Sequence, residues 1–269
     1  MTRMGACLTG VLLVILLALL SWYNSPAAAP RAAQPSKLAG GSERDTRNIG
    51  EQDLERLYPN IILRTGKNVG KLVCLTFDDG PDGTYTPSVL DVLKQKDVKA
   101  TFFLIGRRVE ENPEIAKRVV EEGHLIGNHT YSHANLSKAG PEVEQELSKA
   151  EAAFAKLGLD GSRLFRPAYG AANPSLVEQV SNLGYKVAMW SVDTLDWRGL
   201  SAAEVYRNAL AAMGPGAVIL QHSAGGPGED LSGSVAAIPQ VIDRLTAEGY
   251  RFVTMDEMFN LTAEDCLAG

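Results

Sequence analysis

Short apolar runs alternate with amphipathic stretches along the chain from residue 71 onward. The apolar runs have the length of strands and few polar interruptions, which is typical of strands buried on both faces. Between them, apolar residues recur at helical spacing, as at Ile115, Val119 and Val120 ahead of Gly123. This alternation predicts a parallel sheet covered by helices. Seven such units over about 190 residues predict a barrel slightly smaller than the usual eight-unit one.

The same pattern gives the expected limits of each element. The predicted strands cover residues 72–77, 100–105, 124–126, 163–165, 185–190, 217–220 and 251–254. The predicted helices cover 89–93 behind Pro87, 113–122, 141–157, 174–183, 202–213 and 235–247. Ahead of the barrel, residues 61–63 and 72–77 flank a turn region at 66–70, which predicts a hairpin entering the domain.

The first 60 residues have a different character. Arg3 precedes an unbroken apolar run at 11–20, so residues 1–23 are typical of a signal peptide or an uncleaved signal anchor. Residues 24–60, rich in small residues and proline, predict a flexible linker with a short helix over 51–57, ended by Pro59. We therefore expect an exported, extracytoplasmic protein, secreted or membrane-anchored, that contacts the membrane only through this segment. Its single folded domain is expected at 61–262, with a tail at 263–269.

The composition of the chain limits the classes of molecule that it is expected to bind. A chain of 269 residues with 45% hydrophobic content can bury one substantial core, and we expect a monomer. The 26 basic and 32 acidic residues give a net charge of −6, which argues against nucleic acid and leaves neutral sugar polymers open. Beyond the export segment the cysteines are Cys74 and Cys266. Cys74 lies in a predicted strand, where a buried free thiol behaves as a small hydrophobe, and a bridge to Cys266 is the alternative.

Two adjacent carboxylates, Asp78 and Asp79, follow the apolar run at 72–77. Neighbouring carboxylates at the mouth of a buried strand repel each other and are costly without a cation. A metal removes that cost and allows one acid to serve as ligand and the other as proton acceptor. The alternative is a loop that caps the next helix.

Polar residues suited to chemistry also follow the ends of four other predicted strands. In a parallel barrel the carboxyl ends of all strands gather on one face, so these residues are expected to converge on one pocket. Together with the two carboxylates, the converging residues are Asn128 and His129, Arg166, Asp193 and Asp196, and His222.

His129 and His133 are separated by four positions. On a helical turn that spacing places both rings on one face, and Asp79 would complete a two-histidine, one-carboxylate metal site. Taken alone, such a pair is more often made of surface or core histidines. Arg166, on a proline-containing turn, would hold a neighbouring carboxylate ionised, or would pair with a surface acid.

Five segments of the chain together resemble, in order, the motifs of the NodB-type polysaccharide deacetylases, carbohydrate esterase family 4: TFDDG, HTYSH, RPAYG, DTLDW and LQH. The resemblance covers roughly residues 61–259, and Ala168 stands where a proline is commoner. It implies a distorted (β/α)7 barrel and one divalent metal, usually zinc, with cobalt, nickel or manganese as alternatives.

The resemblance also implies a role for each matching residue. It makes Asp79, His129 and His133 the metal ligands. Asp78 would be the general base, paired with Arg166, and His222 the general acid, tuned by Asp196. The backbone N–H of Tyr169 would complete the oxyanion site, and Trp197 and Leu220 would line the sugar pocket. Asp193 matches its motif, but its role stays open between structure and catalysis.

The function expected from the resemblance is removal of N-acetyl groups from the amino sugars of a cell-wall polysaccharide. Peptidoglycan ranks ahead of chitin-type oligomers because the domain is expected to be tethered at the cell surface. Hydrolysis of small amides on the same scaffold is one alternative, which the export segment argues against. A catalytically silent sugar-binding module is another, and the presence of Asp78 and His222 argues against it.

Overall fold

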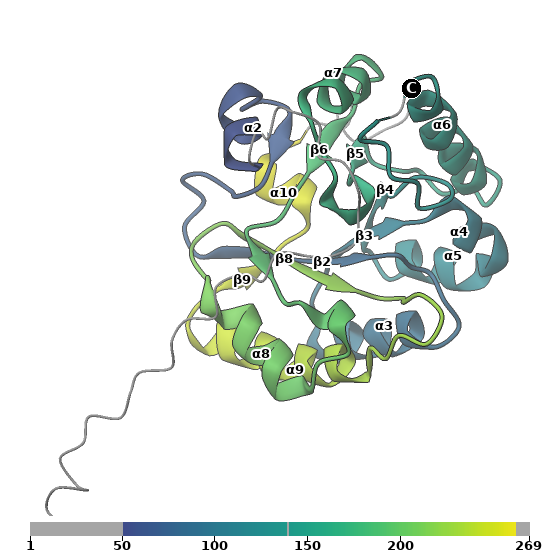
Figure 1. The fold of residues 1–269 in the computed structure, drawn as a ribbon. Helices are drawn as coiled ribbons and strands as arrows, with labels where there is room; N and C mark the ends of the chain where they lie inside the picture. The colour runs from purple at the N-terminus through teal and green to yellow at the C-terminus, as the bar shows by residue number, and fades with distance from the viewer. Residues whose placement is uncertain (1–50, 139, 262–269) are drawn as a thin grey trace, which may run out of the picture. The chain divides into compact units, whose positions relative to one another are not determined.

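A computed structural model describes residues 51–138 and 140–261 of the chain (Figure 1). The segments 1–23 and 24–50, the tail at 263–269 and Cys266 lie outside the described residues, so the predictions made for them stay predictions. Across the described residues, no helix has both the length and the apolar character needed to cross a membrane.

A curled, wholly parallel sheet forms the centre of the domain. The strand order is β1-β6-β5-β4-β3-β2-β8-β7, and β9 pairs with β2. Its strands are β1 (Ile62–Leu63), β2 (Leu72–Asp78), β3 (Thr101–Leu104), β4 (Leu125–Asn128), β5 (Leu164–Phe165), β6 (Lys186–Ala188), β7 (Val192–Asp193), β8 (Ala217–His222) and β9 (Arg251–Phe252). β6 and β7 follow each other closely in the chain. β6 pairs with β5 and β7 pairs with β8, so this one segment connects the two sides of the curled sheet. The distorted (β/α)7 barrel expected from the sequence is confirmed.

Most of the helices surround this sheet on its outside, whereas α10 lies within the ring that they form (Figure 1). They are α2 (Glu51–Leu57), α3 (Tyr85–Lys96), α4 (Gly106–Glu111), α5 (Pro113–Glu121), α6 (Glu142–Ala155), α7 (Pro174–Asn182), α8 (Ala202–Ala211), α9 (Ser232–Ala247) and α10 (Met255–Phe259), with 3-10 turns η1 (Ala168–Gly170) and η2 (Asp196–Arg198). The sequence pattern did not predict α4, α10 or the two 3-10 turns. These elements have three to six residues, too few for helical periodicity to be visible.

The pleat of the strands divides the core into layers. In β2, Val73, Leu75 and Phe77 pack in one cluster with side chains of α3 and α9, whereas Cys74 packs in another. This alternation is expected because successive side chains of a strand point to opposite faces of the sheet. The Cys74 cluster also takes side chains from β3, β5, β6 and β8, and α10 contributes Met255 and Met258 to it. Cys74 itself is a buried free thiol.

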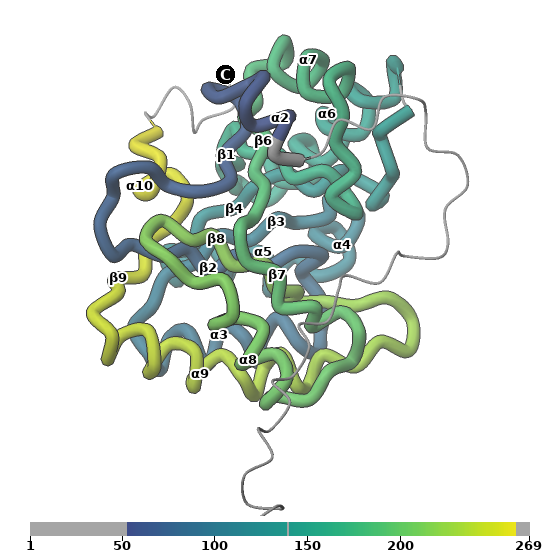
Figure 2. Tube along the Cα trace, turned by 60° about the vertical axis from the view of Figure 1, so that its left-hand side comes forward, coloured from purple at the N-terminus to yellow at the C-terminus, as the bar shows by residue number. Residues whose placement is uncertain are grey.

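The predicted hairpin is wrong. β1 pairs in parallel with β6, with Ile62 opposite Val187, and does not pair with β2 (Figure 2). The physical reason is that both edges of β2 are occupied. β8 runs along one edge, while β9 and then β3 fill the other, so no edge is left for β1.

The helix predicted over 51–57 is confirmed as α2. Its Leu54 is buried in the same cluster as Ile62 and Val187, so α2 packs on the barrel. The folded domain therefore starts before residue 61, inside the segment that was expected to be linker.

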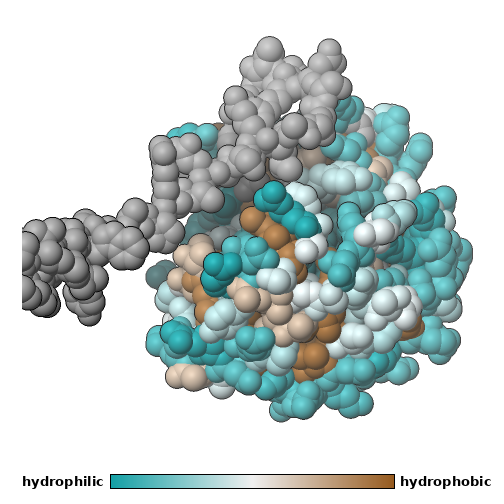
Figure 3. All heavy atoms as spheres, turned by 60° about the horizontal axis from the view of Figure 1, so that its bottom comes forward, coloured by the Kyte–Doolittle hydropathy of each residue, from teal (hydrophilic) through white to brown (hydrophobic). Residues whose placement is uncertain are grey.

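The surface turned toward the viewer in Figure 3 is mostly hydrophilic, with hydrophobic atoms in small separate groups. Scattered exposed apolar side chains are normal for a globular domain.

Candidate active site

The predicted convergence of strand-end residues is observed. Asp78 is the last residue of β2 and lies directly opposite His222, the last residue of β8, in the ladder. His129 and Arg166 follow β4 and β5 immediately, and the Arg166 N–H donates to the carbonyl oxygen of Asn128. Parallel pairing brings all these strand ends to one edge of the sheet.

Three side chains meet at this edge in an arrangement suited to a metal. Asp79 Oδ1 lies 3.3 Å from His129 Nε2 and 3.2 Å from His133 Nε2. The ligand atoms of the three residues lie within 4.8 Å of one another. Among the described residues, no donor makes a hydrogen bond to this buried Asp79 oxygen. A carboxylate oxygen facing two imidazole nitrogens is a donor set that divalent zinc accepts.

The protonation state of His129 strengthens the case for a cation. Its Nδ1 lies 2.7 Å from the carbonyl oxygen of Arg166, which can only accept, so Nδ1 carries the proton. When the ring is neutral, Nε2 presents a lone pair to the Asp79 carboxylate, and the two lone pairs repel unless a metal cation or a second proton on the ring lies between them. The three residues therefore fit a divalent metal.

The charge state of Asp79 is compatible with that role. Burial works against the charged carboxylate, but in the metal-free site a protonated His129 above all, together with His133 and His222, outweighs burial and holds the pKa of Asp79 below its usual range. A bound cation would take the place of that positive charge. Asp79 is thus ionised, as a metal ligand must be.

The expected helical turn beneath the two histidines is wrong. Residues 129–133 form a loop in which Thr130 and His133 have left-handed backbone conformations, with φ of 66° and 62°. Asn128 Oδ1 accepts the Thr130 N–H at 2.9 Å, which turns the chain directly after β4. The two rings are brought together by this turn, not by helical spacing.

Arg166 lies beneath the carboxylates and is fully buried. Its Nη1 donates to Asp78 Oδ1 at 2.7 Å and to Thr76 Oγ1 at 2.8 Å, and its guanidinium lies 4.1 Å from the centre of the Phe103 ring. Pairing with a surface acid, the alternative considered for Arg166, is therefore wrong. The arginine holds one oxygen of Asp78, while the other lies 3.8 Å from His129 Nε2, beside the candidate metal ligands.

His222 and Asp196 form a second buried pair across the site. The His222 Nδ1–H donates to Asp196 Oδ1 at 2.8 Å, and the His222 backbone N–H donates to Asp196 Oδ2 at 2.8 Å. Burial disfavours the imidazolium, but Asp196, with further help from Asp78 and Asp79, outweighs burial and raises the pKa of His222 to about 10. The arrangement keeps His222 protonated, and its Nε2 takes no part in the hydrogen bonds to Asp196.

The remaining predicted residues lie close by. Tyr169 has a left-handed backbone (φ 60°) in η1, and its exposed ring packs 4.5 Å from the His133 ring. Trp197 follows Asp196 and donates its backbone N–H to Asp196 Oδ1 at 3.0 Å, while Leu220 is buried in β8. Asp193 Oδ1 accepts the Leu195 N–H at 2.8 Å, which gives Asp193 a turn-forming contact.

Sequence reasoning assigned no role to three residues that hold the site together, one of which, Thr76, begins the TFDDG motif. Thr76 accepts from Arg166, and Ser234 donates to Asp196 Oδ2 at 2.6 Å. Arg108 donates to the carbonyl oxygens of Asp79 at 2.8 Å and Gly225 at 2.7 Å, which links a candidate metal ligand to the loop after β8. The occurrence of a threonine within an otherwise apolar strand could have indicated a role for Thr76. No feature of the neighbouring sequence indicates a role for Ser234 or Arg108.

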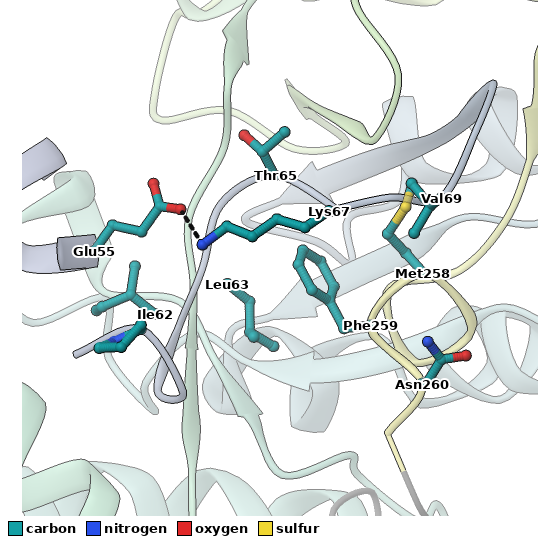
Figure 4. A pocket seen from close by; sticks show the side chains of 10 residues that line it. Glu55, Ile62, Leu63, Thr65, Lys67, Val69, Met258, Phe259 and Asn260 are labelled. Carbon is teal, nitrogen blue, oxygen red and sulfur yellow. Dashed lines mark ion pairs between the residues drawn. The ribbon is translucent and has the colours of Figure 1, made fainter.

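A separate pocket of about 190 Å³ lies between α2, the loop after β1 and the end of α10 (Figure 4). Its lining mixes apolar side chains, such as Phe259, with the ion pair of Glu55 and Lys67, whose charged atoms are 3.3 Å apart. None of the residues that meet at the strand ends lines it, so this pocket is distinct from the candidate active site.

Comparison with known proteins agrees with the geometry. Residues 65–188 match the family model described as polysaccharide deacetylase. A peptidoglycan-N-acetylglucosamine deacetylase of Bacillus cereus is 46% identical over 193 residues, which cover 71% of this chain and 70% of the relative. A chitooligosaccharide deacetylase of Azorhizobium caulinodans is 36% identical over 188 residues, covering 66% of this chain and 90% of the relative.

A solved structure is similar in fold as well. It is the Bc1960 peptidoglycan N-acetylglucosamine deacetylase in complex with 4-naphthalen-1-yl-N-oxidanyl-benzamide. The TM-score is 0.73 and the identity 42%, with 77% of this chain and 97% of that chain covered.

Proposed function

Because this chain belongs to the polysaccharide deacetylase family, carbohydrate esterase family 4, we propose that it removes acetyl groups from the N-acetylglucosamine units of peptidoglycan. The relative named for peptidoglycan is 46% identical to this chain, against 36% for the one named for chitooligosaccharides, which supports peptidoglycan as the substrate. The observation that carries the proposal is the meeting of one candidate metal site with two buried charge pairs, Arg166–Asp78 and Asp196–His222.

Asp79, His129 and His133 would hold one divalent metal, zinc in the first place and cobalt, nickel or manganese as alternatives. When bound, such a metal polarises the amide carbonyl and lowers the pKa of water, which makes amide hydrolysis feasible near neutral pH.

The chain's own residues divide the proton transfers. Asp78 accepts a proton from the attacking water as a new C–O bond forms, and Arg166 keeps its carboxylate ionised and oriented. The Tyr169 backbone N–H donates to the developing oxyanion, and Trp197 and Leu220 line the sugar pocket. As the C–N bond breaks, His222 gives its proton to the leaving amine. The products are acetate and a free amino sugar.

The location of the reaction follows from the first 23 residues. Their apolar run supports export, with the domain acting outside the cytoplasm, either released or held at the membrane. Peptidoglycan is reached from that side of the membrane.

Acetate release from purified peptidoglycan and from chitooligosaccharides, with and without a chelator, tests the proposal. We expect release from peptidoglycan that is lost with chelator and restored by added zinc. Acetate release from chitooligosaccharides alone would refute peptidoglycan as the substrate. If the metal-loaded protein releases acetate from neither glycan, the proposed deacetylase activity is refuted and a catalytically silent binding module is favoured. Hydrolysis of small amides only would favour a small-amide hydrolase.

The His222–Asp196 pair leads to a prediction about pH. If His222 is the acid, activity falls on the alkaline side as the imidazolium loses its proton. The Asp196 carboxylate raises the pKa of His222, so its removal lowers that pKa, and Asp196→Asn should move the alkaline limb of the rate profile to lower pH. The measurement is the pH dependence of kcat/KM for acetate release, with circular dichroism to verify folding. An alkaline limb that stays in place would show that Asp196 does not tune the acid.

A further inference from the structure

We infer that Glu146 is a positioning residue for the metal site, because its carboxylate holds the loop that carries both histidine ligands. The inference rests on the metal site proposed above. Glu146 lies on α6, outside the sequence motifs, and does not contact the candidate ligand side chains through any hydrogen bond described for it.

The Glu146 carboxylate accepts hydrogen bonds from the middle of the loop. Its Oε2 accepts the backbone N–H of Tyr131 at 3.0 Å and that of Ser132 at 2.8 Å, and its Oε1 accepts the Ser132 hydroxyl at 2.9 Å. Tyr131 and Ser132 lie between His129 and His133 in the chain. One side chain thus fixes the two peptide units that set the distance between the ligands.

The carbonyl groups of the same loop are held from the other side. The backbone N–H groups of Gly106 and Arg107, at the start of α4, donate to the carbonyl oxygens of Thr130 and Tyr131 at 3.0 Å each. A side chain at Gly106 would bring its Cβ to 2.7 Å from Cα of Ala150 in α6, so glycine lets the two helices approach. The loop is therefore clamped between α4, which supplies donors, and α6, which supplies the acceptor Glu146.

The loop needs such a clamp because of its backbone. Thr130 and His133 both adopt left-handed conformations, and for the β-branched Thr130 this conformation is unfavourable and persists only where surrounding contacts enforce it. Without Glu146, two backbone N–H groups lose their acceptor, and the loop can relax away from this conformation. His133, the more exposed of the two histidines, would then lose its place beside Asp79.

The side chain of Tyr131 provides an anchor that does not depend on Glu146. Its hydroxyl donates to Glu110 of α4 at 2.9 Å, and the Lys149 ammonium of α6 lies 3.8 Å from the ring centre. These contacts should keep the loop near its place in a Glu146 variant. The expected effect is therefore weaker metal binding in a folded protein.

The test measures zinc and cobalt dissociation constants of the full-length protein, with the visible spectrum of the cobalt form as a report on coordination geometry. Glu146→Ala should raise the dissociation constant by about 10- to 100-fold, the usual scale for residues that orient ligands, and should alter the cobalt spectrum. Glu146→Gln keeps an oxygen that can accept from the two N–H groups. Its metal dissociation constant should therefore fall between those of Glu146→Ala and the parent protein. Glu144→Ala, an exposed glutamate on the same helix, is the matched control and should leave affinity unchanged.

The outcomes separate this inference from the metal proposal. If the parent protein binds neither metal, the metal site itself is refuted. If the parent binds metal and Glu146→Ala binds it equally well with an unchanged spectrum, Glu146 has no positioning role, even if the variant melts at a lower temperature. Should Glu146→Ala not fold, Glu146→Gln carries the test, and parental affinity and an unchanged spectrum in that variant overturn the inference.

Discussion

Asp78→Asn is expected to lower the rate of deacetylation by at least about 100-fold while metal stays bound, since loss of a general base typically costs 10²- to 10⁴-fold. Asparagine keeps the shape of the side chain but cannot accept the water proton. The candidate ligands Asp79, His129 and His133 are untouched, so metal content should match that of the parent protein. The measurements are kcat for acetate release and the metal-to-protein ratio after dialysis.

The substitution also removes the negative partner of a buried guanidinium. Arg166 keeps its bonds to Thr76 and to the carbonyl of Ala188, but breaking a buried pair by removal of one partner is destabilising, so melting temperature must be measured alongside the rate. Asp91→Asn is a matched control, because it breaks an aspartate–arginine pair with Arg118 at 2.6 Å on the surface. Near-parental turnover of Asp78→Asn would mean that another group is the base.

His129→Ala is expected to abolish metal retention and, with it, activity above background. His129 is buried, its Nε2 faces Asp79 and its Nδ1 is held by the Arg166 carbonyl, so the ring is preorganised for the proposed ligand role. Alanine removes one of three protein donors and the group that fixes their geometry. Metal analysis of the dialysed protein is the primary measurement, with acetate release as the second.

His124→Ala provides the control for His129→Ala. The two histidines flank the same strand, β4, and both are buried. The His124 ring packs at a tilt against Phe102, with ring centres 5.3 Å apart, and its Nδ1 accepts the Ala100 N–H at 3.1 Å. His124 is thus a neutral core residue, and burial lowers its pKa to about 4. Its removal should cost stability and leave metal binding intact. Stoichiometric metal in His129→Ala would refute the proposed site, whereas loss of metal in both variants would point to general disruption of the barrel.

The sequence by itself determined the barrel and the composition of the site. Apolar runs and helical spacing are local signals, so strands β2 to β6, β8, β9 and the longer helices could be predicted, whereas the two-residue strand β7 could not. Parallel pairing then required the polar ends of the predicted strands to meet. Asp78, Asp79, His129, Arg166 and His222 could be grouped in this way before any distance was known. The motif resemblance assigned their roles, and those roles stay predictions until the variants are measured.

The tertiary structure decided what depends on contacts distant in sequence or on loop conformation. β1 pairs with β6 because both edges of β2 are occupied, and edge occupancy cannot be read from one strand. The histidine loop takes left-handed conformations that the HTYSH pattern does not indicate. Thr76 meets Arg166 across 90 residues, and Glu146 reaches the loop from a helix whose pattern marks it only as a surface acid. Such contacts are set by how whole elements pack, and so the residues that hold the site in place appear only in the folded chain.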